Sequence, residues 1–131
     1  MSQKAKQFRK PRNKRAKRFV PKQSEARKHK QGMYNTPEWK TYRFRFLHHN
    51  PYCYLCMQPS RIVDHIKNHN GNEELFWNIT NFMPMCKLCH DTVTGKFDRH
   101  VPQLLEEKLK YIENLRKEFN VTVKIKIVEK K

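Results

Sequence analysis

The chain lacks long apolar runs, and both glycine and acidic residues are scarce. Only 37% of its 131 residues are apolar, and Gly occurs three times. No stretch approaches the roughly 20 apolar residues of a membrane-spanning helix. Residues 1–20 are basic and lack the apolar segment of a secretion signal. These absences exclude a membrane span and predict one small domain with a modest core, located in the cytoplasm.

The scarcity of acidic residues gives the chain an extreme positive charge. It holds 29 Lys or Arg against 12 Asp or Glu, a formal net charge of +17. The usual partner of such a protein is a polyanion, most commonly nucleic acid. The N-terminal segment lacks the apolar anchors of a helix that lies on an anionic membrane. We therefore expect a nucleic-acid partner and no membrane.

Most of this charge lies near the N-terminus. Residues 1–31 hold 13 Lys or Arg and one acid, which gives +12, and the other 100 residues carry +5. The large apolar side chains of this segment are Phe8, Phe19 and Val20. So little apolar surface cannot offset the entropy lost on ordering. Residues 1–32 are predicted to be a disordered basic arm that neutralises phosphates, with a solubilising tail as the alternative.

Four cysteines form two Cys-x-x-Cys pairs. Twenty-nine residues separate the first pair, Cys53 and Cys56, from the second, Cys86 and Cys89. Two such pairs, each called a knuckle below, are typical of tetrahedral zinc ligation. A small domain often needs a bound metal to stabilise its fold. Two disulfides or a redox pair are the alternative. Because a reducing cytoplasm favours thiolates, we predict one structural Zn²⁺ held by all four cysteines.

Apolar periodicity and turn residues predict a domain over residues 33–100 and an extension over residues 101–131. Helices and short strands alternate in this prediction, so the fold class is α+β. The expected elements are a helix from Thr36-Pro37 to Asn50, strands at 61–66 and 82–85, a helical turn at 74–77, helices at 88–98 and from Pro102, and a C-terminal strand at 121–128.

Three residues near the two predicted strands suggest a reaction. Adjacent side chains of a strand point to opposite faces, so Asp64 can bind a divalent ion while His65 faces water. His90 follows directly on the second knuckle and supplies another ligand. A histidine can deprotonate a water, and a divalent cation can stabilise charge on the phosphate and the leaving oxygen. This combination predicts phosphodiester cleavage.

These residues resemble the HNH endonuclease motif of the ββα-metal nucleases, and most closely the phage-type HNH proteins. The resemblance runs from about Trp39 to Thr94. It implies a small ββα-metal core, stapled by the zinc and flanked by helices. The matching elements are Glu38-Trp39-Lys40, Asn50-Pro51-x-Cys53, Val63-Asp-His-Ile-x-x-His-x-Gly71, Glu74-Leu-Phe-Trp77, Asn81, and Cys86-x-x-Cys-His-Asp91.

The resemblance also implies residue roles. His65 would be the general base, Asp64 and His90 would hold a catalytic Mg²⁺, Mn²⁺ or Ni²⁺, and Asn81 would brace the loop that orients His65. Products of the family normally carry 5′-phosphate and 3′-hydroxyl ends. The candidates for nucleic-acid binding are Arg61, His69, Lys87, Lys96 and Arg99. His69 could instead support His65.

One departure from the family pattern follows the second knuckle. The family often has Cys-His-x-x-Lys-Thr, whereas Val93 occupies the lysine position here. We expect Lys96 or Lys87 to replace that lysine in space.

The sequence therefore predicts a metal-dependent HNH endonuclease that nicks double-stranded DNA. It would act as a monomer or weak dimer, in the host cytoplasm if it is phage-encoded. A zinc-stapled nucleic-acid-binding protein without catalysis is the main alternative, and a nuclease or ribosome-associated protein directed to RNA is another. The presence of Asp64, His65 and His90 together favours the enzyme, because a binder needs no base beside a metal ligand.

Overall fold

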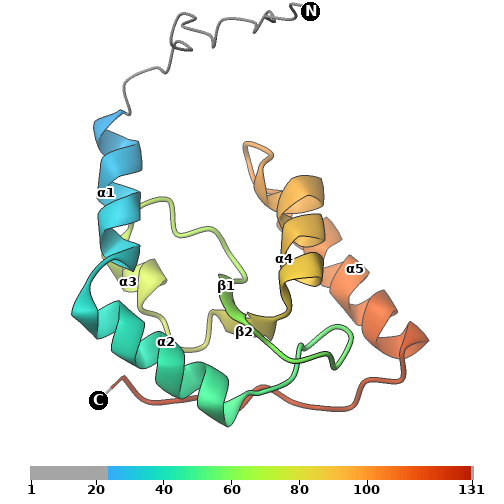
Figure 1. The fold of residues 1–131 in the computed structure, drawn as a ribbon. Coiled ribbons are helices and arrows are strands. Elements are labelled where there is room, and N and C mark those ends of the chain that lie inside the picture. The colour runs from blue at the N-terminus through green and yellow to red at the C-terminus, as the bar shows by residue number, and fades with distance from the viewer. Residues whose placement is uncertain (1–23, 131) are drawn as a thin grey trace, which may run out of the picture.

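The computed structural model describes residues 24–130, and a two-stranded antiparallel sheet lies at their centre (Figure 1). Strands β1 (Ile62–His65) and β2 (Phe82–Met85) pair with Ile62 opposite Met85 and His65 opposite Phe82. Helix α4 (Lys87–Val93) follows β2 after a single residue and contacts β1. Both strands lie where the sequence predicts them, and the ββα unit within an α+β domain is confirmed.

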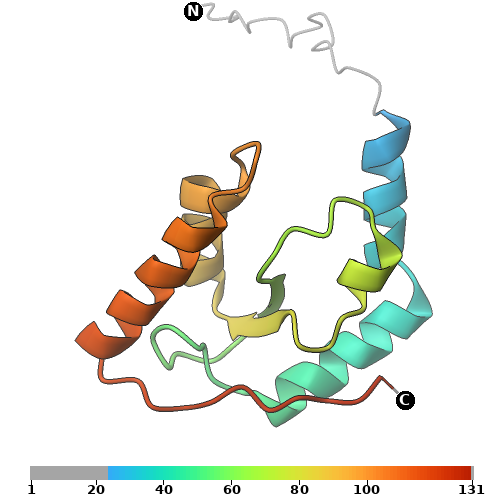
Figure 2. The ribbon, with the colours of Figure 1, turned by 180° about the vertical axis from the view of Figure 1, so that it is seen from behind.

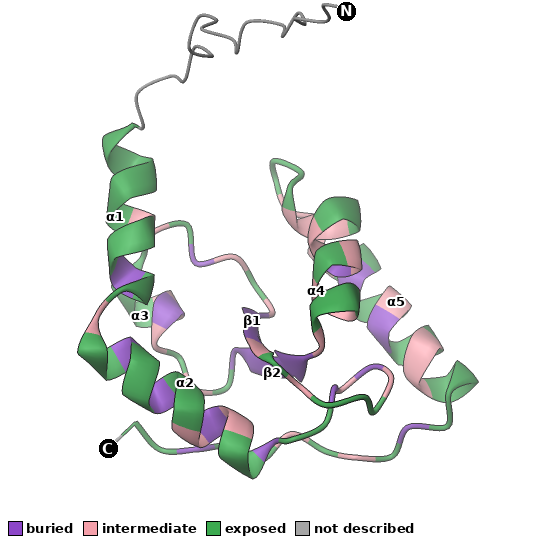
Figure 3. Cartoon of the chain, viewed as in Figure 1, coloured by how far each residue is buried: buried purple, intermediate pink, exposed green. Residues whose placement is uncertain are grey.

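Helix α2 (Pro37–His49) has the boundaries that its capping residues predict. The Thr36 side chain accepts a hydrogen bond from the Trp39 backbone N–H at 3.1 Å, and Pro37 occupies the first helical position. Asn50 ends the helix. One face of α2 is buried, as the purple stripe in Figure 3 shows. Its aromatic side chains form the core of this half of the molecule.

The sheet separates two hydrophobic clusters, and the alternation of its strands assigns residues to them. Val63 and Phe82 pack with the aromatic residues of α2. Met83 and Met85 pack on the other side, with Val93 of α4 and residues of the cysteine knuckles. The same alternation applies to the polar residues of β1. Asp64 therefore faces the α4 side, and the His65 ring packs with the aromatic residues of the α2 side.

Beyond the sheet, the predicted helices are present with shifted ends. Helix α3 (Glu73–Phe76) is a single turn capped by Asn72, and α4 continues into a π-helical turn, η1 (Thr94–Asp98). Helix α5 (Leu105–Glu118) begins three residues after Pro102. The loop before α3 requires a glycine, because Gly71 has a φ of +84°. None of the helices within residues 24–130 is long and apolar enough to cross a membrane.

Helix α1 (Glu25–Tyr34) begins inside the segment of residues 1–32 that is predicted to be a disordered arm, so that prediction needs correction for residues 24–32. Ser24 caps the helix by accepting from the Arg27 N–H at 3.1 Å. Met33 is buried, and the Tyr34 ring packs edge-on against Trp39. The apolar contacts of the helix come from its last turn alone, so its sequence shows no apolar periodicity. Residues 1–23 of the predicted arm lie outside the described residues.

The predicted strand at 121–128 is wrong, although its alternation of burial is partly present. Val121 and Val128 are buried, yet these residues pair with neither strand of the sheet. Side chains supply the hydrogen bonds instead. Asn50 bonds both the N–H and the C=O of Lys126, at 2.7 and 3.0 Å, and Tyr42 donates to the Val128 carbonyl at 2.6 Å. The segment thus crosses beneath α2 without joining the sheet (Figure 2).

Candidate active site

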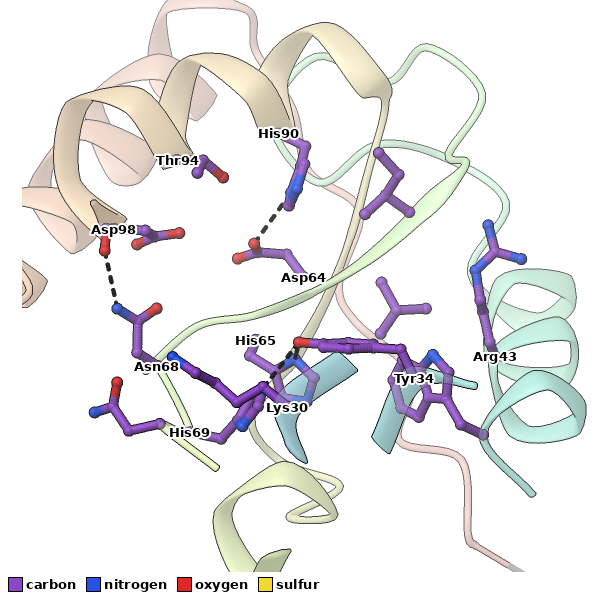
Figure 4. A pocket seen from close by; sticks show the side chains of 14 residues that line it. Lys30, Tyr34, Arg43, Asp64, His65, Asn68, His69, His90, Thr94 and Asp98 are labelled. Atoms are coloured by element: carbon purple, nitrogen blue, oxygen red, sulfur yellow. Dashed lines mark hydrogen bonds and ion pairs between the residues drawn. The ribbon is translucent and has the colours of Figure 1, made fainter. Parts of the chain in front are cut away.

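A cleft of about 440 Å³ opens over β1, between α1 and α2 on one side and α4 and η1 on the other. It collects Asp64, His65 and His90, which the sequence singles out (Figure 4). The other polar and aromatic residues that line it are Lys30, Tyr34, Trp39, Arg43, Asn68, His69, Asn70, Thr94 and Asp98.

Asp64 and His90 face each other across this cleft. Asp64 Oδ1 lies 3.2 Å from His90 Nδ1, and the carboxylate raises the pKa of the His90 imidazole. The angles of this contact are not those of a hydrogen bond. Nδ1 of His90 is therefore buried without a hydrogen-bond partner among residues 24–130. Two neighbouring ligands of an octahedral ion, with bonds of about 2.1 Å, lie about 3 Å apart. The two atoms therefore fit adjacent ligands of one divalent cation.

The second oxygen of Asp64 is held by Lys108, a completely buried lysine on α5. The Lys108 ammonium donates to Asp64 Oδ2 at 3.0 Å and to the Ile66 carbonyl at 2.8 Å. It also lies 3.1 Å from a carboxylate oxygen of Asp98, at the end of η1. This network fixes the Asp64 side chain and leaves Oδ1 directed toward His90.

The ammonium group beside Asp64 belongs to Lys108. The two lysines that the sequence analysis named, Lys87 and Lys96, lie elsewhere. Lys87 pairs with Asp91 at 2.8 Å on the exposed side of α4. Lys96 Nζ lies 5.8 Å from the centre of the Tyr111 ring. Sequence reasoning missed Lys108, although one signal was present. It lies four residues before the buried Ile112, on the apolar stripe of α5, where a lysine must find a buried partner.

His65 is packed among aromatic rings rather than facing open water. Its ring stacks on Trp39 with centroids 5.6 Å apart, and Nε2 lies 3.0 Å from the Phe76 carbonyl oxygen. Because a carbonyl can only accept, Nε2 carries the proton and Nδ1 keeps its lone pair. Burial disfavours the imidazolium and lowers the pKa of His65. A neutral imidazole with an available Nδ1 suits a proton acceptor.

Asn81 clamps the chain where it leaves β1. Its side-chain oxygen accepts from the Lys67 N–H at 2.9 Å, and its Nδ2 donates to the Lys67 carbonyl at 2.9 Å. Its own carbonyl accepts from the Ile66 N–H. These three bonds fix the backbone directly after His65.

His69 is buried beside His65, which leaves little room for contact with a phosphate. Its Nδ1 accepts from the Gly71 N–H at 3.0 Å, and its Nε2 lies 2.8 Å from the Tyr34 hydroxyl oxygen. Both ring nitrogens are thus engaged within the protein. Tyr34 escaped sequence reasoning because it ends α1, a helix that begins inside the predicted arm of residues 1–32.

The other predicted nucleic-acid contacts are exposed and lie outside the lining of the cleft. These residues are Arg61, Lys87, Lys96 and Arg99. Lys30 of α1 and Arg43 of α2 line it instead. The Arg43 guanidinium is turned toward the start of β1, where it donates to the Arg61 carbonyl at 2.6 Å.

The four cysteines come together as the knuckle spacing predicts. All four Sγ atoms lie within 4.8 Å of one another, and Cys56 Sγ lies 3.7 Å from both Cys86 Sγ and Cys89 Sγ. These separations are far longer than the S–S bond of a disulfide. Zinc–sulfur bonds of about 2.3 Å give a tetrahedron with edges of about 3.8 Å. The group could therefore hold a tetrahedral metal ion.

Among solved structures, the chain is similar to the HNH endonuclease of the deep-sea thermophilic bacteriophage GVE2, crystallised with a manganese ion. The two chains are 23% identical and the TM-score is 0.49. The match covers 55% of this chain and 85% of the other. No protein-family model matches the chain, and no curated protein matches it.

Replacing Lys108 with Met is expected to lower the free energy of unfolding by about 3–5 kcal/mol, because Asp64 and Asp98 would remain buried without their cation. Urea unfolding measures the effect. Lys110→Met is the matched control, since Lys110 lies on the exposed side of the same helix. Equal stability of the two variants would contradict the prediction.

Proposed function

We propose that this chain is a metal-dependent HNH endonuclease that hydrolyses phosphodiester bonds in DNA. The main support is the cleft in which Asp64 and His90 face each other at 3.2 Å, beside a neutral His65 with an available Nδ1. A protein that only binds nucleic acid has no use for this arrangement. The HNH-like sequence elements agree with it.

In this proposal the residues divide the work of phosphodiester hydrolysis. Nδ1 of His65 takes a proton from the attacking water. Asp64 and His90 hold a divalent ion, with Mg²⁺, Mn²⁺ and Ni²⁺ as the candidates for this mixed oxygen and nitrogen site. When bound, such an ion stabilises negative charge on the phosphate and the leaving oxygen. Asn81 keeps the loop after β1 in place, and Lys108 holds the orientation of Asp64.

Double-stranded DNA is the proposed substrate, cut one strand at a time. The net charge of +17 supports a polyanionic substrate, and Lys30 and Arg43 carry positive charge to the walls of the cleft. Residues 24–130 bring Asp64, His65 and His90 together in one cleft, which suits nicking, so a double-strand cut requires two chains or two successive nicks. We propose a monomer or weak dimer that acts in the cytoplasm, that of the host if a phage encodes it.

Replacing His65 with Ala is expected to lower the nicking rate by about 10²–10⁴-fold, because a general base acts in the transition state and contributes little to DNA affinity. A plasmid-nicking assay with Mg²⁺ or Mn²⁺, together with a DNA-binding titration, measures both quantities. His48→Ala is the control, since His48 is exposed and lies outside the lining of the cleft. Wild-type nicking by the His65 variant would reject the proposed base. DNA binding without nicking by the wild type would favour the non-catalytic alternative.

We further propose that the metal held by the four cysteines is zinc. One tightly bound zinc per chain is expected by elemental analysis. Cys86→Ser should unfold the domain, because metal binding supplies folding free energy in small domains. Leu88→Ser is the matched control, since Leu88 lies in the same knuckle and is 77% exposed. Natively purified, active protein without zinc, or unchanged melting of the Cys86 variant, would contradict this proposal.

Two truncations separate the basic segment from helix α1. Residues 1–23 hold ten Lys or Arg and no acid, so deleting them is expected to weaken DNA binding and to flatten its salt dependence. Each lost phosphate contact should reduce the slope of log K against log salt by about 0.9. This variant should still nick DNA at low salt. Deleting residues 1–31 also removes most of α1, including Lys30, and should impair nicking itself.

An unchanged salt slope after deletion of residues 1–23 would show that the segment does not contact DNA. Equal nicking by the two truncations would show that α1 contributes nothing to the site.

A further inference from the structure

We infer that Tyr34 is a positioning residue for His65, acting through a hydrogen-bonded chain that begins at the backbone of Gly71 and passes through His69. This inference rests on the proposed function, because it assigns a supporting residue to the proposed base. It connects α1 with β1 and the loop that directly follows β1, and Tyr34 lies 31 residues before His65 in the sequence.

The direction of the chain follows from its first donor. The Gly71 N–H donates to Nδ1 of His69 at 3.0 Å, so in a neutral ring the His69 proton is on Nε2. Burial lowers the pKa of His69 to about 4, which keeps the ring neutral at physiological pH. Nε2 of His69 therefore donates to the Tyr34 hydroxyl oxygen at 2.8 Å.

The hydroxyl proton of Tyr34 then has one acceptor among the ring nitrogens around it. The Tyr34 oxygen lies 3.5 Å from Nδ1 of His65, the nitrogen with the lone pair. Burial raises the pKa of Tyr34 to about 12, so the hydroxyl keeps its proton. Nε2 of His65 is occupied by the Phe76 carbonyl at 3.0 Å. The bond at Nε2 thus fixes the tautomer of His65, and the longer contact at Nδ1 adds a weak restraint on its ring plane.

The length of the final contact matters for the proposed reaction. A separation of 3.5 Å is at the long limit of a hydrogen bond, so the contact is weak and can open. A water that enters the cleft can then accept from the Tyr34 hydroxyl while it donates to Nδ1 of His65. The tyrosine therefore orients His65 before substrate enters without occupying Nδ1 permanently.

Helix α1 is docked firmly enough to hold Tyr34 in place. His29 Nε2 lies 3.0 Å from the Gly71 carbonyl oxygen, at the loop that starts the chain. The Tyr34 ring packs edge-on against Phe76 and Trp39, with centroids 5.1 and 5.8 Å apart. The helix and the loop thus meet at both ends of the hydrogen-bonded chain.

Tyr34→Phe tests the chain most directly, because it removes the hydroxyl and keeps the ring that packs on Phe76. We expect about a two- to three-fold lower kcat for nicking with KM unchanged, because the contact that is lost from the positioning of the base lies at the weak end of the hydrogen-bond range. Tyr52→Phe is the matched control, because Tyr52 is exposed and lies outside the lining of the cleft. An unchanged kcat for Tyr34→Phe, or a loss confined to KM, would overturn the inference.

His69→Gln and the double variant with Tyr34→Phe test whether the two residues act in series. In one chain, the His69 change should have little further effect on kcat once the tyrosine hydroxyl is gone. If the two decreases multiply, His69 acts independently of Tyr34, for example on a phosphate, and the chain is rejected.

Nitrogen-15 NMR of labelled histidine tests the same contact without any catalysis. In protein with its tightly bound metal but no added divalent ion, His65 should have its proton on Nε2. Tyr34→Phe should shift the Nδ1 resonance of His65, and Tyr52→Phe should not. An unchanged Nδ1 resonance would overturn the chain. Absence of nicking by the wild type would instead reject the proposed function, and the NMR result would still decide the contact.

Discussion

The alternation of β1 is the constraint on which the rest of the site depends. Two adjacent residues, Asp64 and His65, must point to opposite faces of a two-stranded sheet, and both are buried. The residues packed on each face of the sheet must therefore supply hydrogen-bond or ion-pair partners for one buried polar side chain. The α4 and α5 side provides His90 and Lys108 for the carboxylate, while the α1 and α2 side provides aromatic rings and a carbonyl for the imidazole. The cleft lies where these two environments meet.

The carboxylate side shows why a helix outside the predicted nuclease domain belongs to the site. A buried carboxylate without a partner is costly, and Asp98 lies close to Asp64 through their shared contact with Lys108. The ammonium of Lys108 partly balances the two negative charges and also bonds the backbone after β1. The predicted domain boundary at residue 100 therefore places α5 outside the nuclease domain, although Lys108 of α5 positions Asp64 inside that domain. The N-terminal boundary at residue 32 likewise cuts through α1 just before Tyr34.

The parts of the structure that the sequence predicted are those with local signals. Thr36 and Asn50 delimit α2 through capping, and the cysteine spacing brings four thiols together. The missing parts depend on contacts distant in sequence. Helix α1 is held by apolar contacts of its last turn and by the contact of His29 with the Gly71 carbonyl. The alternation at 121–128 could not reveal that Asn50 and Tyr42 would take the place of a neighbouring strand. Lys108 is an intermediate case. Its position on the apolar stripe of α5 indicated that it has a buried partner, but the sequence did not identify Asp64 and Asp98 as that partner.

Helix α1 links the basic N-terminal segment to the proposed base along the chain. Helix α1 has ten residues and therefore spans about 15 Å. It begins beside residue 23, where the most basic part of the sequence ends, and it finishes at Tyr34, whose hydroxyl lies 3.5 Å from Nδ1 of His65. The helix that joins this segment to the cleft is thus shorter than half of one helical turn of duplex DNA, since a full turn measures about 34 Å. In the proposed nuclease, a phosphate contact made by that segment and a strand bound over His65 can belong to the same duplex, so that the affinity of the segment helps to place the bond that is cut.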